Sequence, residues 1–184
     1  MRIDKAHTIA LFVDIQERLV PAMEQSAALI ERNVLLLQGL QALEVPALFL
    51  RQYPKGLGDI VPELRAAARP DMTPMDKLAF SAMQDEAIAA VFLSWRGQGI
   101  KNVIVTGVEA HVCVLQSCVD LVAAGFSPFL AVDCISARRA CEKELALRRA
   151  EQEGVRLTTA ESVLFELCVQ AGTEPFKVIS KLVR

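Results

Sequence analysis

The chain has 184 residues, of which 53% are hydrophobic and 23% are charged, and its formal net charge is −2. A chain of this length can bury a substantial core, and we expect a single domain over residues 1–184. The composition excludes a disordered chain, and no apolar run reaches the roughly 18 residues of a membrane span. Without a basic stripe, nucleic acid and anionic membrane are not expected partners, whereas a small-molecule substrate is.

Cysteine usage indicates the compartment. The five cysteines are an odd number and contain no C-x-x-C pair, and the N-terminal segment shows no basic region followed by an apolar signal-type block. Disulfides are rare where cellular thiols are kept reduced. We therefore expect reduced thiols and a cytoplasmic location.

The first half of the chain alternates apolar strands with amphipathic helices. The apolar run 7–13 ends at Asp14 and is typical of a central parallel strand covered on both faces. Apolar residues at helical spacing predict a helix over 26–43, with Ser26 as its N-cap. In chain order we then expect a strand at 47–50, a loop at 51–59 and a helix at 61–68. A second loop at 69–74 follows, and we expect Lys77 to lie in a loop before a helix at 82–97.

The second half continues this alternation. The run 103–105 predicts a buried strand that Gly107 ends, and helical spacing resumes over 112–124. Beyond these we expect a strand at 127–132, a helix at 142–153, a strand at 155–158, and helices at 160–169 and 175–184. The pattern predicts a parallel sheet wrapped by right-handed crossovers, with ligands outside the carboxyl ends of the strands. Four residues fall at such ends: Asp14, Arg51, Gly107 and Asp133.

Cys113 is the first candidate for chemistry. It falls near a predicted helix N-terminus, where free N–H groups and the helix dipole favour a thiolate and can hold an oxyanion. Asp14 and Lys77 could join it, because an ammonium favours the thiolate and a carboxylate can accept and return the proton. Spacing alone leaves alternatives open: a core cysteine, a helix-capping aspartate and a solvated lysine.

Other chemistries have less support in the sequence. His7 lies at the amino end of the first strand, the wrong edge for a site at the carboxyl ends. His111 precedes Cys113 by two residues, a separation that rarely lets an imidazole face the thiol, so we expect a packing or hydrogen-bonding role. The chain has no H-E-x-x-H, no paired cysteines, no glycine-rich dinucleotide turn and no P-loop. We therefore expect no metal and no cofactor.

Three segments carry a resemblance to a known family. They are Val13-Asp14-Ile15-Gln16, Lys77 followed by Phe80-Ser81, and Gly107-Val108-Glu109-Ala110-His111-Val112-Cys113-Val114. In this order and spacing they resemble the isochorismatase-like, or cysteine hydrolase, superfamily, from about His7 to Leu167. The segment Gln52-Tyr53-Pro54-Lys55-Gly56-Leu57-Gly58 is similar to the branch of isochorismatase domain-containing proteins.

The resemblance implies a fold and a mechanism. The fold would be a three-layer α/β/α sandwich around a central, mostly parallel, Rossmann-like sheet, in a homo-oligomer of two or more chains. The catalytic triad would be Asp14, Lys77 and Cys113, with Asp14 taking the thiol proton, Lys77 stabilising the charged pair, and Cys113 forming a thioester that water hydrolyses. A cis peptide between Val108 and Glu109 would aim the Glu109 N–H, with that of Cys113, into an oxyanion hole.

The departures from the family pattern narrow the expected substrate. Nicotinamidases place metal-binding aspartate and histidine residues after the second strand, where this chain has Arg51-Gln52-Tyr53-Pro54, so we expect a metal-free protein that is poor at nicotinamide hydrolysis. True isochorismatases do not rely on a nucleophilic cysteine, so Cys113 favours an amidohydrolase acting on a small amide, ureide or ester. The alternative is a non-catalytic binding or assembly module that keeps the fold. The expected substrate-pocket residues are Gln16, Tyr53, Leu57 and Phe80.

Overall fold

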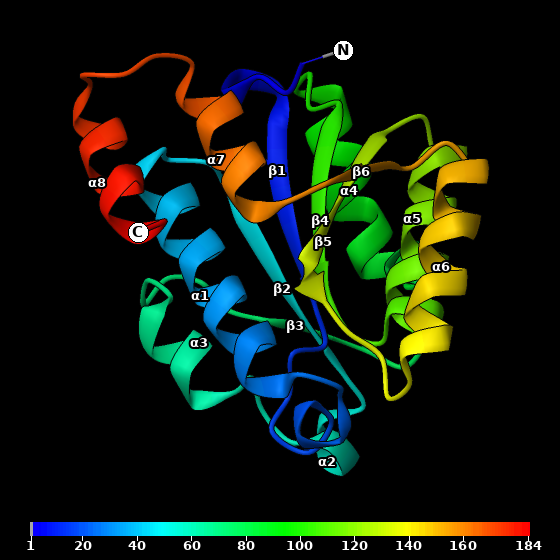
Figure 1. Ribbon diagram of the computed structural model, residues 1–184. Helices are drawn as coiled ribbons and strands as arrows, with labels where there is room; N and C mark the ends of the chain where they lie inside the picture. Colours follow the sequence, from blue (N-terminus) through cyan, green and yellow to red (C-terminus); the bar gives the residue numbers. More distant parts are fainter. Residues whose placement is uncertain (1) are drawn as a thin grey trace.

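The computed structural model describes residues 2–184 and has three layers, with one sheet between two sets of helices (Figure 1). Six strands lie in the order β3-β2-β1-β4-β5-β6, and every neighbouring pair is parallel. Their bounds are β1 Thr8–Val13, β2 Ala47–Gln52, β3 Met75–Lys77, β4 Asn102–Gly107, β5 Ser127–Ile135 and β6 Arg156–Thr158. The parallel sheet expected from the alternating pattern is confirmed.

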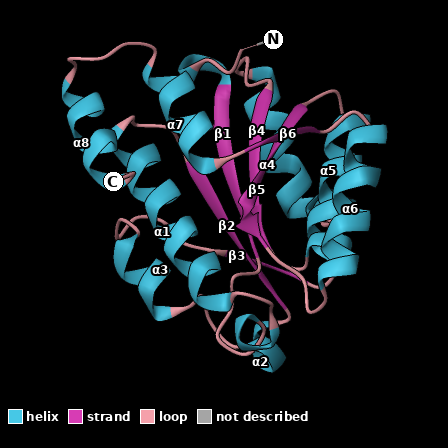
Figure 2. Ribbon diagram, in the orientation of Figure 1, coloured by secondary structure: helices cyan, strands magenta, loops and turns pink. Residues whose placement is uncertain are grey.

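Helices cover both faces of the sheet (Figure 2). On one side lie α1 Ser26–Ala42, α3 Pro62–Ala67 and α7 Ala160–Cys168, with α8 Glu174–Leu182 packed against α1 and α7. On the other side lie α4 Glu86–Gly97, α5 Leu115–Ala123 and α6 Ala140–Gln152. The short helix α2 Pro54–Leu57 lies beyond the carboxyl ends of the strands, at the bottom of Figure 1.

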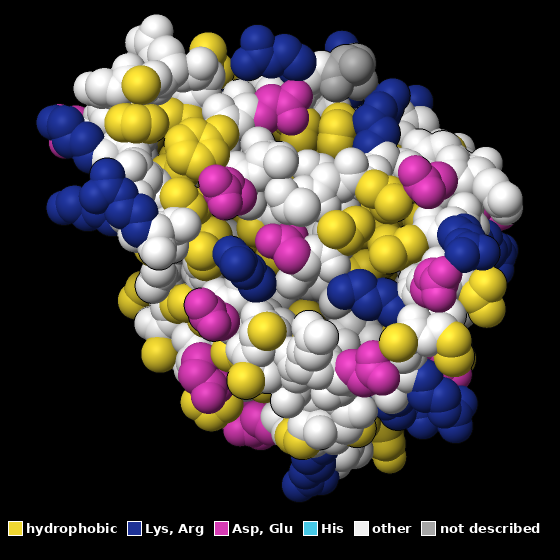
Figure 3. Space-filling view, viewed as in Figure 1, with side chains coloured by type: hydrophobic (Ala, Val, Ile, Leu, Met, Phe, Trp, Pro, Cys, Tyr) yellow, Lys and Arg dark blue, Asp and Glu magenta, His cyan; other side chains and the backbone are white. Residues whose placement is uncertain are grey.

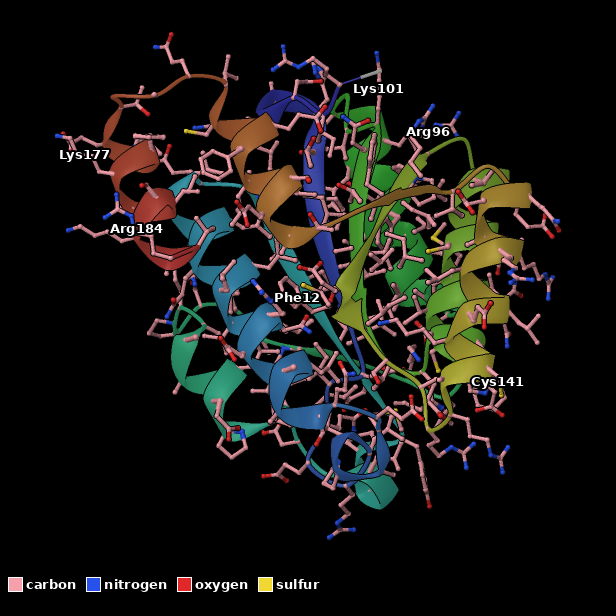
Figure 4. The ribbon with its side chains drawn as sticks, viewed as in Figure 1. Phe12, Arg96, Lys101, Cys141, Lys177 and Arg184 are labelled. Atoms are coloured by element: carbon pink, nitrogen blue, oxygen red, sulfur yellow. The ribbon has the colours of Figure 1, made fainter. Side chains whose placement is uncertain are left out.

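The core has two halves, one on each face of the sheet. All six residues of β1 are buried, with Phe12 in the half beneath α1 and Leu11 in the half beneath α4 and α5. The Phe12 ring stacks on that of Phe49 at a centroid distance of 4.8 Å, and Figure 4 shows Phe12 inside the molecule. Burial on both faces explains why the strand residues are apolar without alternation.

The strand order reverses between β1 and β4, and Gly107 ends β4 at this switch point. Its φ is 117°, and a Cβ there would lie 1.9 Å from the Val13 carbonyl oxygen. The next residue, Val108, donates its N–H to that same oxygen at 2.9 Å. Glycine is therefore required for the chain to turn past the end of β1, which is the place where such folds bind ligands.

The structure differs from the sequence prediction at Lys77. We expected a loop, but Lys77 ends the edge strand β3 and pairs in register with Gln52 of β2. A strand of three residues that includes Asp76 and Lys77 has no apolar pattern to reveal it. The predicted second strand was correspondingly too short, because β2 continues through Arg51 to Gln52.

Helix starts also differ. Ser26 is the first residue of α1 rather than its cap, because Gln25, with a φ of 52°, occupies the N-cap. The predicted helix over 82–97 is two elements: a 3-10 turn at Ala82–Gln84 and then α4, whose first N–H groups are capped by the carboxylate of Asp85.

The surface carries mixed charge. In the view of Figure 3, Lys and Arg side chains alternate with Asp and Glu. Within residues 2–184, none of the helices combines the length and the apolar character that crossing a membrane requires.

Candidate active site

Two residues from separated strands meet in the interior at the carboxyl edge of the sheet. Lys77 Nζ lies 2.7 Å from Asp14 Oδ2, and both side chains are fully buried. Asp14 directly follows β1, Lys77 ends β3, and β2 lies between them. Asp14 has a φ of 53°, so the chain turns immediately after β1. The structure thus brings together Asp14, which the sequence placed at a strand end, and Lys77, which it placed in a loop.

Oxygen atoms surround the Lys77 ammonium. Besides Asp14, it donates to Gln52 Oε1 at 2.7 Å, to the Phe80 carbonyl at 3.2 Å and to the Ala79 carbonyl at 3.4 Å. An ammonium has three N–H donors, so these acceptors use its full capacity.

Cys113 completes the cluster from the other side of the switch point. It lies in a π-helical turn, Ala110–Val114, which continues into α5, and it is 5% exposed. Its thiol faces Asp14 and Lys77. Asp14 Oδ1 is buried and has no hydrogen-bond partner within residues 2–184. That oxygen is therefore an unoccupied acceptor inside the cluster.

The electrostatics differ from the sequence expectation of a stabilised thiolate. Burial, and then the negative charge of Asp14, raise the pKa of Cys113 to about 12, although Lys77 lowers it. Burial also raises the pKa of Asp14, against the lowering effects of Lys77, the Cys113 thiol and the Gln52 main chain. Desolvation outweighs the helix terminus here. The resting thiol is neutral, and it lies beside a carboxylate whose affinity for a proton is increased.

Glu109 lies directly before this turn. The Val108–Glu109 peptide bond is cis. The Glu109 carbonyl accepts the N–H groups of Val112 at 3.0 Å and Val114 at 3.3 Å, and its carboxylate accepts Arg138 Nε at 2.9 Å. Across residues 2–184, the Glu109 N–H makes no backbone hydrogen bond.

His111 pairs with an acidic residue and not with the thiol. Its Nε2 lies 3.6 Å from Glu142 Oε2. Within residues 2–184, the possible ligand atoms of Glu109, His111 and Glu142 lie within 4.8 Å of one another. However, Arg138 bonds Glu109 and Arg139 bonds Glu142, so both carboxylates already have cationic partners. We interpret this group as ion pairs.

We expected Gln16 to line the substrate pocket, but it does not. Its side chain is fully buried, and its amide bonds the main chain of Gln52, accepting the N–H at 2.8 Å and donating to the carbonyl at 3.1 Å. It also donates to the Gly58 carbonyl at 2.8 Å. With every amide contact made to backbone, Gln16 supports the site from behind.

The other expected pocket residues lie on the surface near Lys77. Tyr53 and Phe80 are about half exposed, and Leu57 is partly buried in α2. Sequence reasoning missed Leu78, which is 73% exposed beside them. A hollow of about 440 Å³ is lined by Pro54, the segment 76–79 and residues 84–87. Its lining includes Lys77 but neither Asp14 nor Cys113.

Gln52 belongs to this buried cluster, although the sequence analysis did not single it out. It is the second acceptor of Lys77, and its Nε2 donates to the Leu78 carbonyl at 2.8 Å. The available signal was a polar residue after an apolar strand, two positions beyond the predicted strand end. A strand end is where parallel sheets present their ligands.

The fold and the residues at its switch point define a hydrolase-type α/β protein, and comparisons with known proteins identify the family. An isochorismatase domain matches residues 8–162. The chain belongs to the isochorismatase-like hydrolase family, as the three sequence motifs predicted.

Individual relatives are similar over nearly the whole chain. Isochorismatase domain-containing protein 1 of Salmo salar is 33% identical over 97% of this chain and 62% of its own length. The chain thus spans somewhat under two thirds of that relative. A structure described as the MAR1 ribonuclease from Caenorhabditis elegans matches with a TM-score of 0.91 and 31% identity, over 100% of this chain and 92% of the other.

A second solved structure shows the same fold. The YcaC gene product of Escherichia coli is described as an octameric hydrolase of unknown specificity. It matches with a TM-score of 0.90 and 23% identity, over 99% of this chain and 89% of the other. At this identity the likeness establishes the fold.

Proposed function

We propose that the protein is a metal-independent cysteine hydrolase that cleaves a small amide, ureide or ester through a thioester on Cys113. One observation carries the proposal: the fully buried Lys77–Asp14 ion pair, 2.7 Å long, lies beside the Cys113 thiol. Burying two charges is costly, and a free acceptor oxygen next to a thiol serves a proton transfer.

The proposed reaction keeps the charge of the site constant. As the Cys113 sulfur attacks the substrate carbonyl carbon, its proton passes to Asp14, so negative charge moves from the Asp14 carboxylate to the carbonyl oxygen of the substrate while Lys77 stays positive. That oxyanion is held by the N–H groups of Glu109 and Cys113. As the oxyanion collapses to the thioester, the leaving amine or alcohol takes the proton from Asp14. Water then attacks the thioester, giving a proton to Asp14, and the departing sulfur takes that proton back as the carboxylic acid is released.

The last two residues of β2, Arg51 and Gln52, support metal independence. Arg51 bonds Asp76 at 2.7 Å and Asp59 at 2.9 Å, and Gln52 bonds Lys77. Neither carries the imidazole or carboxylate that a nicotinamidase-type metal would need. These side chains instead close the edge of the sheet around the ion pair.

The proposal also includes the oligomeric state and the cellular compartment of the enzyme. A homo-oligomer of two or more chains is consistent with the octameric relative. The five cysteines are free, which fits a reducing, cytoplasmic compartment. One relative is named a ribonuclease. A net charge of −2 without a basic stripe does not favour RNA as the substrate, and a small acyl compound suits a buried thiol better.

Acyl-enzyme trapping on a substrate panel tests the proposal. The protein is quenched in acid after brief exposure to small amides, ureides, esters or an RNA oligonucleotide, and peptide mass spectrometry locates any adduct. We expect a mass increase on Cys113, together with turnover that Cys113→Ala abolishes and Cys141→Ala, at an exposed cysteine, leaves intact. Turnover in the Cys113→Ala variant, or RNA cleavage alone, contradicts the mechanism. Binding without any adduct would instead favour the non-catalytic module.

A further inference from the structure

The position of the Lys77 ammonium depends on a residue outside the triad. Two of its contacts are short, one to the Asp14 carboxylate and one to Gln52 Oε1, each at 2.7 Å. The remaining contacts are carbonyl oxygens at 3.2 and 3.4 Å. Gln52 therefore contributes half of the short contacts that hold this charge.

The amide of Gln52 has only one orientation that satisfies its neighbours. Its Nε2 donates to the Leu78 carbonyl at 2.8 Å, which leaves Oε1 facing Lys77. The reversed amide would place its NH₂ group against an ammonium and its oxygen against a carbonyl, so two donors and two acceptors would meet. The environment thus presents an oxygen to Lys77 without adding a negative charge.

Gln16 fixes the main chain that carries this amide. It accepts the Gln52 N–H at 2.8 Å and donates to the Gln52 carbonyl at 3.1 Å. The Gln16 N–H itself bonds the Asp14 carbonyl at 2.9 Å. Hydrogen bonds therefore link Asp14, Gln16, Gln52 and Lys77 in a closed ring, and all four residues are buried. A closed ring fixes distances that an open chain of contacts would leave free.

We propose that Gln52, held by Gln16, is a positioning residue that fixes the Lys77 ammonium against Asp14 and so governs proton transfer from Cys113. The inference rests on the proposed function. Gln52 accepts a hydrogen bond from Lys77 without carrying a charge. A second carboxylate in its place would oppose the negative charge that forms on sulfur. Gln52 does not touch the reacting atoms, and its effect passes through Lys77.

The charged groups around the thiol define what a titration would report. The groups that act on Cys113 are Asp14, from the end of β1, and Lys77, from β3. Glu109 and His111, on its own turn, are paired with Arg138 and Glu142. The titrations of Asp14 and Cys113 are coupled, so alkylation of the sulfur should begin when the pair loses its first proton and Asp14 can accept the thiol proton, and should then reach a plateau. Loosening Lys77 should move that first step to higher pH.

Alkylation with iodoacetamide between about pH 4 and pH 10 measures this step, with peptide mass spectrometry reporting the rate at Cys113. We expect Gln52→Met, which keeps the chain length but removes the amide, to raise the midpoint of the first step by about one unit and to lower the plateau. Gln16→Met should shift the midpoint in the same direction by less. Gln41→Met is the matched control, because its partly buried amide bonds the Ala67 carbonyl away from the site; it should leave the profile unchanged.

The outcomes separate the two proposals. An unchanged profile in a folded Gln52→Met protein overturns the positioning role while the proposed function stands. Wild-type Cys113 that reacts only as an ordinary thiol overturns the proposed function and this inference with it. Circular dichroism checks the fold; should Gln52→Met not fold, Gln52→Asn, whose amide is one methylene too short to reach Lys77, must give the same upward shift or the inference fails.

Discussion

Lys77 and Asp14 lie 63 residues apart in the chain, yet their side chains form a fully buried ion pair with an N–O distance of 2.7 Å. Such a pair gains little over an apolar pair, but the loss of one partner leaves an unpaired charge in the interior. The pair is therefore sensitive to single substitutions and tolerant of double ones. This asymmetry provides the first test.

Lys77→Met should lower the free energy of unfolding by about 3–5 kcal/mol, because Asp14 is then buried without a cation. Asp14→Asn in the same protein should recover part of this loss, since the amide is neutral. Denaturant unfolding of the wild type, both single variants and the double variant measures the coupling. Strictly additive losses would show that the two side chains do not interact.

Asp14→Asn should change how Cys113 titrates. The charge of Asp14 raises the pKa of the thiol, and Lys77 lowers it, so removing the carboxylate lowers the pKa from its value of about 12. The thiol then loses its proton in one step, without an earlier step shared with Asp14. The rate of iodoacetamide labelling at Cys113 against pH shows this directly. A profile that keeps the early step contradicts the role of Asp14 as proton acceptor, and turnover should be lost in the same variant.

Metal removal should leave the enzyme unchanged. At the end of β2, Arg51 bonds Asp76 and Gln52 bonds Lys77, and the carboxylates of Glu109 and Glu142 are paired with Arg138 and Arg139. We expect equal rates on the best ester or amide substrate before and after dialysis against a chelator, and little nicotinamide turnover. Elemental analysis of the purified protein is the independent check. Strong nicotinamide hydrolysis that a chelator abolishes would contradict the proposal.

Alkaline pH should destabilise the fold through Cys118. This thiol is fully buried, and burial alone raises its pKa from 9.0 to about 12. Above pH 9 the unfolded thiol loses its proton while the folded one keeps it, so the unfolded state binds fewer protons and stability falls as pH rises through this window. Cys118→Ala should make the slope of unfolding free energy against pH shallower by up to about 1.4 kcal/mol per unit. Cys141→Ala, at an exposed position, should leave the slope as it is.

Gly107→Ala should be strongly destabilising, by about 4 kcal/mol or more, because the new Cβ would overlap the Val13 carbonyl, 1.9 Å away. Gly172→Ala is the matched control: its φ of 86° is also positive, but a Cβ there meets nothing within 4 Å. That change should cost only about 1–2 kcal/mol of backbone strain. Thermal unfolding of both variants compares them, and equal losses would show that the close approach is unimportant.

Much of the fold was predictable because buried parallel strands are continuous apolar runs. The run before Asp14 and the run before Gly107 both became neighbouring central strands, as their composition indicated. The sequence did not reveal β3, because an edge strand of three residues pairs on one side only and has no apolar run to mark it. An apolar pattern in the sequence indicates that a face of a strand is buried, and an edge strand buries little of its surface.

The site was predictable in its members and not in its energetics. Motif order named Asp14, Lys77 and Cys113, but the hydrogen bonds that close around Lys77 depend on register, which no local pattern encodes. Gln16 was adjacent to the motif and looked like a pocket residue, whereas the structure turns its amide onto the Gln52 backbone. The neutral thiol also follows from burial, a property of the assembled fold and not of the helix start.

The strand order means that the site forms only when the sheet has folded. Four adjacent strands in the order β3-β2-β1-β4 lead to Lys77, Gln52, Asp14 and Cys113 in turn. Two consecutive segments of the chain cannot assemble these four residues, since Cys113 follows β4 and the Lys77 ammonium lies on the edge strand β3. An unfolded chain therefore exposes all five thiols, and only the completed sheet places the Cys113 thiol beside the Lys77–Asp14 ion pair. Selective labelling of Cys113 would then report, molecule by molecule, that the edge strand has docked in register.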